Sequence, residues 1–274
     1  MPTRQRRSVL LTIIGCAIVI AMLFPLYWAF AGSLKTNNQI FAIPPTFLPT
    51  TPTFDSYEDA FAAQWRALVT SIIVSAGTVL LSLVVATPAA YALAHFKFHA
   101  TTVLVTCLLL AQMIPPVVLA NSLYVIFNRV GLLNSYVGLI AGDSSLAIPF
   151  SVLILRAYMQ SIPPELPEAA YVDGAGDLEG FLRIVLPISR SAIITAALFA
   201  FLFAWGDFLF ALTLLTKPGI QPITLSLYRF FGIFLTAWNR AMATAVITSI
   251  PAALLLVLAQ RFITAGLTAG SLKG

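Results

Sequence analysis

The sequence predicts an all-α membrane protein with six transmembrane helices. Of its 274 residues, 59% are hydrophobic and only 9% are charged, and the mean hydropathy is +0.95. Soluble domains contain roughly 45–50% apolar and about 25% charged residues. Uncharged apolar runs of the length that a spanning helix needs, about 20 residues, recur along the chain. No hydrophilic segment is long enough for a separate soluble domain, so we expect one membrane domain over residues 1–274.

The first expected span, residues 9–31, is free of charge, and Pro25 is expected to kink it. A cleaved signal peptide is the alternative interpretation of this segment. The apolar run is longer than the roughly 7–15 residues of a signal peptide's apolar region, so we expect a retained span. A loop with a short surface helix at residues 57–65 leads to the second span, residues 68–93.

The third and fourth expected spans cover residues 101–126 and 137–158, and the third contains Pro115-Pro116 in its middle. Proline offers no N–H group and clashes with the preceding turn, so the helix should break or bend there. Irregular backbone at membrane depth is tolerated only where protein or a water-filled cavity surrounds it. The fourth span has an acidic residue, Asp143, near its start.

The fifth expected span, residues 191–215, contains Asp207, and the sixth, residues 241–260, precedes a short tail. Six spans place both termini on the same side of the membrane. Three arginines precede the first span, and basic residues favour the cytoplasmic side. We therefore expect both termini in the cytoplasm.

The largest loop on the expected cytoplasmic side, residues 159–189, carries the densest charge in the chain. A short helix with a small apolar face is expected from the spacing of Leu166, Ala169, Ala170 and Asp173. Such a short helix is marginal in water by itself, so it could dock onto a partner. The alternative is an amphipathic loop that rests on its own spans or on lipid headgroups.

Two glycines are expected to end this first loop helix, because glycine readily takes the left-handed conformation. They are Gly174 and Gly176. A second helix, residues 178–185, is expected to follow, with Pro187 marking its end before the fifth span.

Motifs for catalysis and for metal or nucleotide binding are missing from the sequence. There is no phosphate-binding G-x-x-x-x-G-K-[ST] loop and no dinucleotide fingerprint. His95 and His99 are interpreted as solvated turn residues, and Cys16 and Cys107 as small apolar residues of the spans. The basic residues form no patch for nucleic acid. We expect a protein with no catalytic residues, no metal site and no cofactor of its own, powered by a gradient or by a partner.

The stretch from Glu168 to Pro187 resembles the cytoplasmic EAA loop of permease subunits from ABC importers. The family pattern is Glu-Ala-Ala, three residues, Gly, nine residues, then Ile-x-Leu-Pro. The chain has Glu168-Ala169-Ala170, Gly174 and Ile184-Val185-Leu186-Pro187, with every spacing matched. The resemblance covers most of the chain, including FPLYWAFAGSLK, QMIPP, GLLNSYVGLI and LAQRFITAGLTAGSLKG. It is to the carbohydrate type, and within it to the smaller maltose-type subunit.

This resemblance implies the type I ABC importer permease fold, in the plasma (inner) membrane of a bacterium. The expected function is translocation of a sugar or oligosaccharide by alternating access, coupled to a separate ATPase that binds ATP and Mg. The implied partners are a second related permease subunit, an ABC ATPase dimer, an extracytoplasmic substrate-binding protein (a lipoprotein in some systems) and membrane lipid. Import of a polyol or glycerophosphate compound is one alternative. A gradient-driven secondary transporter is another, although it would have no use for an EAA loop.

The resemblance also assigns roles to residues of the loop and of the tail. Glu168 would make a charged contact with the ATPase, Ala169 and Ala170 would allow close packing, and Gly174 would make the turn. The remaining expected coupling residues are Asp173, Leu186 and Pro187. The expected ATPase-contacting residues of the tail are Gly266, Gly270 and Lys273.

A substrate pathway is expected near the fifth span, because a carboxylate within a span is costly and usually functional. Asp207, flanked by Trp205 and Phe208, could bind sugar hydroxyls and C–H faces, or could instead serve a structural purpose. Gln112 and Asn121, on either side of the paired prolines, are further candidates. The chain departs from the family pattern at three places, namely Gly206, Thr70 and Ala120-Asn121-Ser122, of which the first and third lie in or near these spans.

Overall fold

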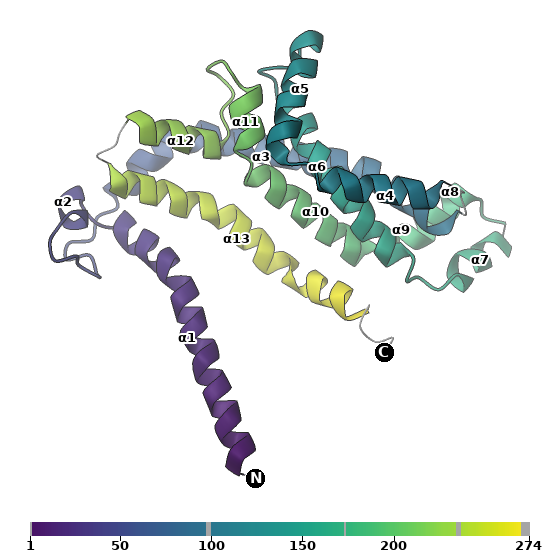
Figure 1. Cartoon of the computed structure of the whole chain (residues 1–274), viewed down its shortest axis with the longest axis horizontal. Coiled ribbons are helices and arrows are strands. Elements are labelled where there is room, and N and C mark those ends of the chain that lie inside the picture. Colours follow the sequence, from purple (N-terminus) through teal and green to yellow (C-terminus); the bar gives the residue numbers. More distant parts are fainter. Residues whose placement is uncertain (1, 97–99, 173, 234–236, 270–274) are drawn as a thin grey trace. The chain divides into compact units, whose positions relative to one another are not determined.

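The computed structural model describes residues 2–96, 100–172, 174–233 and 237–269, and within these ranges every regular element is a helix (Figure 1). The chain divides into two compact units. Unit 1 comprises residues 1–65 and 226–250, and unit 2 comprises residues 66–225 and 251–274. The prediction of an all-helical chain is confirmed.

Unit 1 is built on α1 (Pro2–Ser33), which continues through Pro25 and exposes its apolar side chains along most of its length. Its C-terminal end is held by the start of α3 (Asp55–His95), where Ser33 Oγ lies 2.6 Å from Tyr57 Oη. The unit also contains α2 (Asn37–Ile40), most of α12 (Ile223–Ile233) and the first turns of α13 (Trp238–Ala269).

The helix α3 is longer than expected. The predicted surface helix at residues 57–65 is wrong as a separate element, because α3 runs unbroken through 41 residues. No glycine or proline interrupts residues 55–76, and Asp55 and Glu58 in the first turn complement the helix dipole. At 1.5 Å per residue the helix is about 60 Å long, roughly twice the thickness of a hydrocarbon core.

Unit 2 contains α3 from Arg66 onward, the last turns of α13 and the helices between residues 101 and 214. The helices between residues 101 and 214 are α4 (Thr101–Gln112), α5 (Pro116–Val130), α6 (Tyr136–Met159), α7 (Glu165–Val172), α8 (Asp177–Gly180), a π-helical turn η1 (Phe181–Val185), α9 (Leu186–Ile188), α10 (Arg190–Trp205) and α11 (Leu209–Leu214). In the parts of the chain that the structure describes, four helices are long and apolar enough to cross a membrane, and two bent helix pairs bring this to as many as six.

The break predicted at the paired prolines is confirmed. Helix α4 ends at Gln112, α5 begins at Pro116, and the two meet at a bend of 99°. In Figure 1, α5 rises steeply from the end of α4.

The structure adds detail to two of the expected spans. Within the fifth expected span, residues 191–215, the helix is interrupted, because α10 stops at Trp205 and α11 begins only at Leu209. Gly206 is a poor helix former, and Asp207 offers the backbone an alternative hydrogen-bonding partner. After the sixth expected span, residues 241–260, α13 continues to Ala269, so Gly266 of the expected tail is helical. Gly270 and Lys273 lie outside the described residues.

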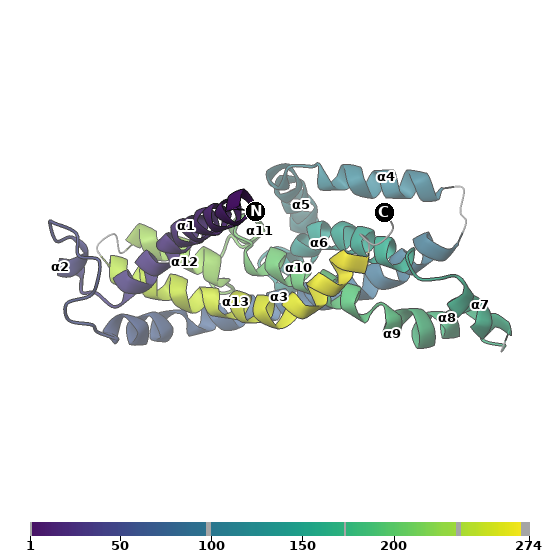
Figure 2. The same cartoon turned by 90° about the horizontal axis from the view of Figure 1, so that it is seen from below.

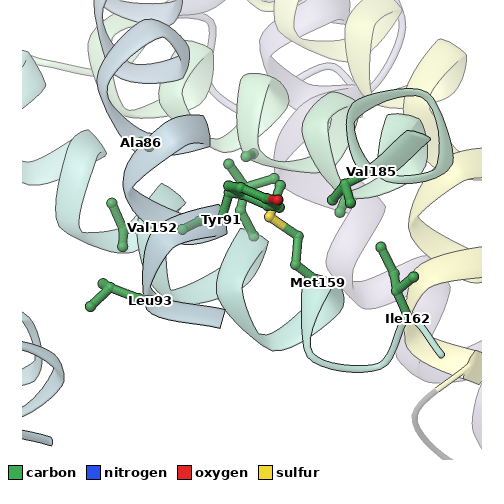
Figure 3. Close-up of a cluster of buried hydrophobic side chains, with 11 residues drawn as sticks. Ala86, Tyr91, Leu93, Val152, Met159, Ile162 and Val185 are labelled. Carbon is green, nitrogen blue, oxygen red and sulfur yellow. The ribbon is translucent and has the colours of Figure 1, made fainter. Parts of the chain in front are cut away.

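Two apolar clusters lie at different levels of unit 2. Cluster 1 comprises Ala86, Ala90, Tyr91, Leu93, Val152, Leu155, Met159, Ile162, Val185, Ala192 and Ala196. Cluster 2 comprises Val74, Ala120, Phe127, Leu139, Phe210, Ala211, Leu214, Leu215 and Leu225. Figure 3 shows part of cluster 1, where Tyr91 of α3 and Met159 of α6 approach each other. Each cluster joins α3 to α6 and to the region of the fifth span.

The start of α6 depends on a close backbone approach at Gly138. Ser135 Oγ donates a hydrogen bond to Leu132 O at 2.7 Å and accepts one from Gly138 N at 3.0 Å. A Cβ atom at Gly138 would lie 2.1 Å from the carbonyl oxygen of Leu132. The preceding loop therefore fits against α6 only because residue 138 has no side chain.

We predict that Gly138→Ala destabilises the protein by ~1–3 kcal/mol, because the backbone must move to admit the methyl group. The measurement is the thermal unfolding of the detergent-purified chain. Gly15→Ala in α1 is the matched control, because a Cβ atom there meets nothing within 4 Å. Equal melting temperatures for the two variants would contradict the prediction.

Candidate functional site

The predicted first helix of the polar loop is confirmed as α7. Pro163 and Pro164 precede it and accept backbone hydrogen bonds from Leu166 and Glu168, at 3.2 and 3.1 Å. Glu165 and Glu168 lie in the first turn, where a helix N-terminus favours negative charge. The side chain of Glu168 is exposed, as are the apolar side chains of Leu166 (45%) and Val172 (88%).

The other expected coupling residues of this segment are placed only in part. Ala169 and Ala170 lie within α7, but their side chains are outside the described part of the structure. Asp173 lies outside the described residues altogether. Gly174 has φ = +89°, which confirms the predicted left-handed turn. The prediction that Gly176 shares this conformation is wrong, because its φ of −80° is the ordinary extended backbone of a residue preceding a helix.

The predicted second helix is present but irregular. The chain passes from α8 through the π-helical turn η1 to α9, which ends at Ile188, one residue beyond Pro187. Proline cannot donate the backbone hydrogen bond that a regular helix would need at this point, and an inserted wide turn is one way to accommodate it. Leu186 is half-buried and Pro187 is exposed.

This second segment is fixed to the spans. The rings of Tyr91 in α3 and Phe181 in η1 lie 4.8 Å apart, and Tyr91 Oη donates to Asp177 O at 3.5 Å. Tyr158 Oη of α6 donates to Ile188 O at 3.2 Å. Val185 is fully buried in cluster 1. Figure 2 shows α7, α8 and α9 following one another at one end of unit 2, so the loop combines an exposed helix with an anchored base.

The break after α10 is organised by Asp207. Its Oδ1 atom accepts a hydrogen bond from Phe210 N at 3.0 Å, and its Oδ2 atom accepts one from Ala211 N at 2.9 Å. The backbone carbonyl of Asp207 accepts a hydrogen bond from Thr224 Oγ1. Both carboxylate oxygens therefore satisfy the first N–H groups of α11, as an N-terminal capping residue does.

The other expected pathway residues have varied surroundings. Trp205 is buried and stacks on Phe201, with ring centroids 5.3 Å apart, and Phe208 is half-buried. Gln112 Nε2 donates to Leu146 O at 3.2 Å and so ties the end of α4 to α6. Asn121 is exposed on α5. One helix break thus carries Trp205, Asp207 and Phe208, and the other carries Gln112. A role in substrate contact stays a prediction for these four residues and for Asn121.

Within the described part of the chain, neither the cavity nor the reactive side chains form a site for chemistry. A cavity of about 600 Å³ is lined by apolar residues of α3, α10 and α13, among them Leu83, Phe201 and Leu258. In the ranges that the structure describes, no three His, Cys, Asp or Glu side chains gather as a metal site would require. His95 ends α3, and His99 lies outside these ranges. Cys16 and Cys107 are free thiols on exposed faces of α1 and α4.

Sequence reasoning missed a group of buried polar side chains in α3 and α6. Asp143 is only 3% exposed, and Ser71, Ser75, Thr78, Ser82, Ser144 and Ser151 are at most 2% exposed. A signal was available, because Ser71, Ser75, Thr78 and Ser82 recur at three- and four-residue spacing and therefore share one helix face. An average hydropathy over the span conceals this face.

The chain belongs to the family of binding-protein-dependent transport system inner membrane components, whose model matches residues 83–268. It is 33% identical over 259 residues to the diacetylchitobiose uptake system permease protein DasC of Streptomyces coelicolor, covering 94% of each chain. It is 32% identical to the trehalose transport system permease protein SugB of Mycobacterium tuberculosis, covering 98% of this chain and 99% of the other.

The fold is that of an ABC importer permease. A chain in the crystal structure of a bacterial ABC transporter that imports the acidic polysaccharide alginate matches with a TM-score of 0.83 at 20% sequence identity. The match covers 95% of this chain and 98% of the other. The resemblance read from the EAA pattern is thereby confirmed for family and fold.

We predict that Gly174→Ala strains the loop turn, because a residue with a Cβ atom pays ~1–2 kcal/mol in the left-handed conformation. Protease cleavage between α7 and α8 should then speed up by roughly tenfold, since 1.4 kcal/mol corresponds to tenfold. Gly176→Ala is the matched control, being exposed, two residues away and at negative φ. Equal cleavage rates in the two variants would refute the left-handed turn at Gly174.

We also predict that Asp207→Ala lowers the stability of the purified chain by ~1–2 kcal/mol through loss of the cap on α11. Asp207→Asn keeps one side-chain acceptor and should lose less. Thermal unfolding and solute uptake are measured side by side. Unchanged unfolding together with abolished uptake would instead make Asp207 a solute ligand.

Proposed function

We propose that this chain is the membrane-spanning subunit of an ATP-driven importer and that its solute is a sugar or oligosaccharide. The observation that carries the coupling part is the exposed helix α7, followed by the turn at Gly174 and by a base fixed to α3 and α6. The solute class is supported by the family and by the carbohydrates in the names of DasC and SugB.

The architecture of the loop suits transmission of movement. Leu166 and Val172 expose apolar surface on a helix of only eight residues, which would be marginal without further support. A partner that covers α7 can therefore stabilise it. The base reaches α3 through Tyr91 and α6 through Tyr158, so displacement of α7 would be passed to two long helices.

The partners proposed for this assembly are a second related permease, a dimer of ABC ATPases and an extracytoplasmic binding protein. ATP and Mg would be bound by the ATPases, because the chain has no phosphate-binding loop. The termini and α7 would face the cytoplasm, as the three arginines at the start of α1 indicate. Moving an equilibrium from almost wholly one state to almost wholly the other takes a differential of about 5.5 kcal/mol, which closure of an ATPase dimer on ATP can provide.

We predict that Glu168→Arg abolishes both association with the ATPase and ATP-dependent uptake while leaving membrane insertion intact. The reversed charge would face the basic groups that an exposed carboxylate at a helix N-terminus is suited to meet. Co-purification of the ATPase with the tagged chain and solute uptake into membrane vesicles are the measurements.

Glu58→Arg is the matched control, with the same charge change on an exposed residue of α3 that the topology places on the opposite side of the membrane. Normal co-purification of the ATPase with the Glu168→Arg chain would refute the coupling role. The ligand of the binding protein encoded beside this chain tests the solute class, and a polyol or glycerophosphate compound there would replace the sugar.

A further inference from the structure

Between its two apolar clusters, the interior of unit 2 is polar. On α3, Ser75, Thr78 and Ser82 lie between Val74 of cluster 2 and Ala86 of cluster 1. All three side chains are at most 2% exposed. They occupy one helix face, because their spacing is three and four residues.

The facing helix shows the same order. On α6, Asp143, Ser144 and Ser151 lie between Leu139 of cluster 2 and Val152 of cluster 1. They too are at most 3% exposed. The apolar packing of both helices is therefore interrupted over the same interval.

Three contacts fix the register and show that the intervals overlap. Thr70 Oγ1 lies 3.4 Å from Tyr136 Oη, the side chain of Ile140 fills the space beside Gly77, and Arg156 Nε donates to Leu93 O at 3.2 Å. Residue numbers rise together along the pair, so α3 and α6 run parallel. The last two contacts pair residues 63 positions apart, so Asp143 and Ser144 are level with the part of α3 between Thr78 and Ser82. Ser151 is level with the start of cluster 1 on α3. We call the set Ser75, Thr78, Ser82, Asp143, Ser144 and Ser151 the polar layer.

The side chains of the polar layer lack hydrogen-bonding partners within the described protein. This holds for the hydroxyl oxygens of its five Ser and Thr residues and for both carboxylate oxygens of Asp143. Buried polar groups are normally paired, and an unpaired group inside a membrane protein is costly. These groups therefore need partners from outside the described protein, and water or a solute that enters the layer can supply them.

We propose that the polar layer is part of the path by which a hydroxyl-rich solute crosses the membrane and that it opens to water at one stage of the transport cycle. Hydroxyl groups can both donate to and accept from a sugar, and Asp143 can accept bonds from solute hydroxyls. The neighbouring 600 Å³ cavity offers only apolar walls and cannot do this. The proposal rests on the proposed function, which it deepens by assigning solute contacts to Asp143 and the hydroxyls.

The test is the reaction of an introduced thiol with a charged, membrane-impermeant methanethiosulfonate reagent. Thr78→Cys is made in the full complex, in a Cys16→Ser, Cys107→Ser background, and is labelled in membranes without nucleotide, with ATP, and with ATP plus vanadate. Ala86→Cys is the matched control, because Ala86 is fully buried on the same face of α3 but belongs to cluster 1. Thr78→Cys should react at least ~10-fold faster than Ala86→Cys in one of these conditions.

Absence of labelling at residue 78 in every condition would overturn the proposal. Equal labelling at residues 78 and 86 would also overturn it, because it would indicate general loosening of the helices. If Thr78→Cys is not inserted, Ser82→Cys replaces it. Labelling requires no solute, so its result does not depend on which solute is transported. It is also independent of the ATPase co-purification that tests the proposed function.

The part played by Asp143 is tested in the same background. Asp143→Leu should slow labelling at residue 78 at least ~3-fold by drying the layer, whereas Asp143→Asn keeps polar atoms there and should leave the rate near that of the parent. An unchanged labelling rate in Asp143→Leu would show that Asp143 does not line the path.

Discussion

The hydrocarbon core of a bilayer offers no hydrogen-bonding partner, so each place where a spanning helix stops must find its partners in protein. The break between α10 and α11 shows how this requirement is met, since Asp207 gives one carboxylate oxygen to Phe210 N and the other to Ala211 N. This cap stabilises the start of α11 after the chain has left α10 at Trp205. At the other break, Gln112 ties the end of α4 to α6 by a hydrogen bond to Leu146 O.

Hydrogen bonds from side chains to backbone groups also connect the polar loop to the interior of unit 2. Tyr91 and Tyr158 place their hydroxyl groups on backbone carbonyls of the loop base, and Val185 fills cluster 1 between the same two helices. Farther along α3 and α6, beyond cluster 1, comes the polar layer. The exposed helix α7 and the buried hydroxyls are thereby attached to one pair of helices, which would allow movement at one to alter exposure at the other.

Local chemistry in the sequence predicted much of this arrangement. The break at Pro115-Pro116, the short helix α7 and the left-handed turn at Gly174 follow from the properties of proline, alanine and glycine alone. The end of α10 at Trp205 did not follow, because a capping bond from Asp207 is a three-dimensional property and hydropathy continues through residue 215. The burial of Asp143 was missed for a related reason: hydropathy reports how apolar a span is and not which face meets another helix.

The energy that moves the solute through this chain is proposed to come from a separate ATPase. Solute accumulation is therefore measured in proteoliposomes that contain the purified complex, with the binding protein outside and either ATP or an ion gradient as the source of energy. We expect accumulation to need enclosed ATP and the binding protein, and to stop with vanadate. Accumulation driven by an ion gradient in the absence of ATP would refute coupling to an ATPase.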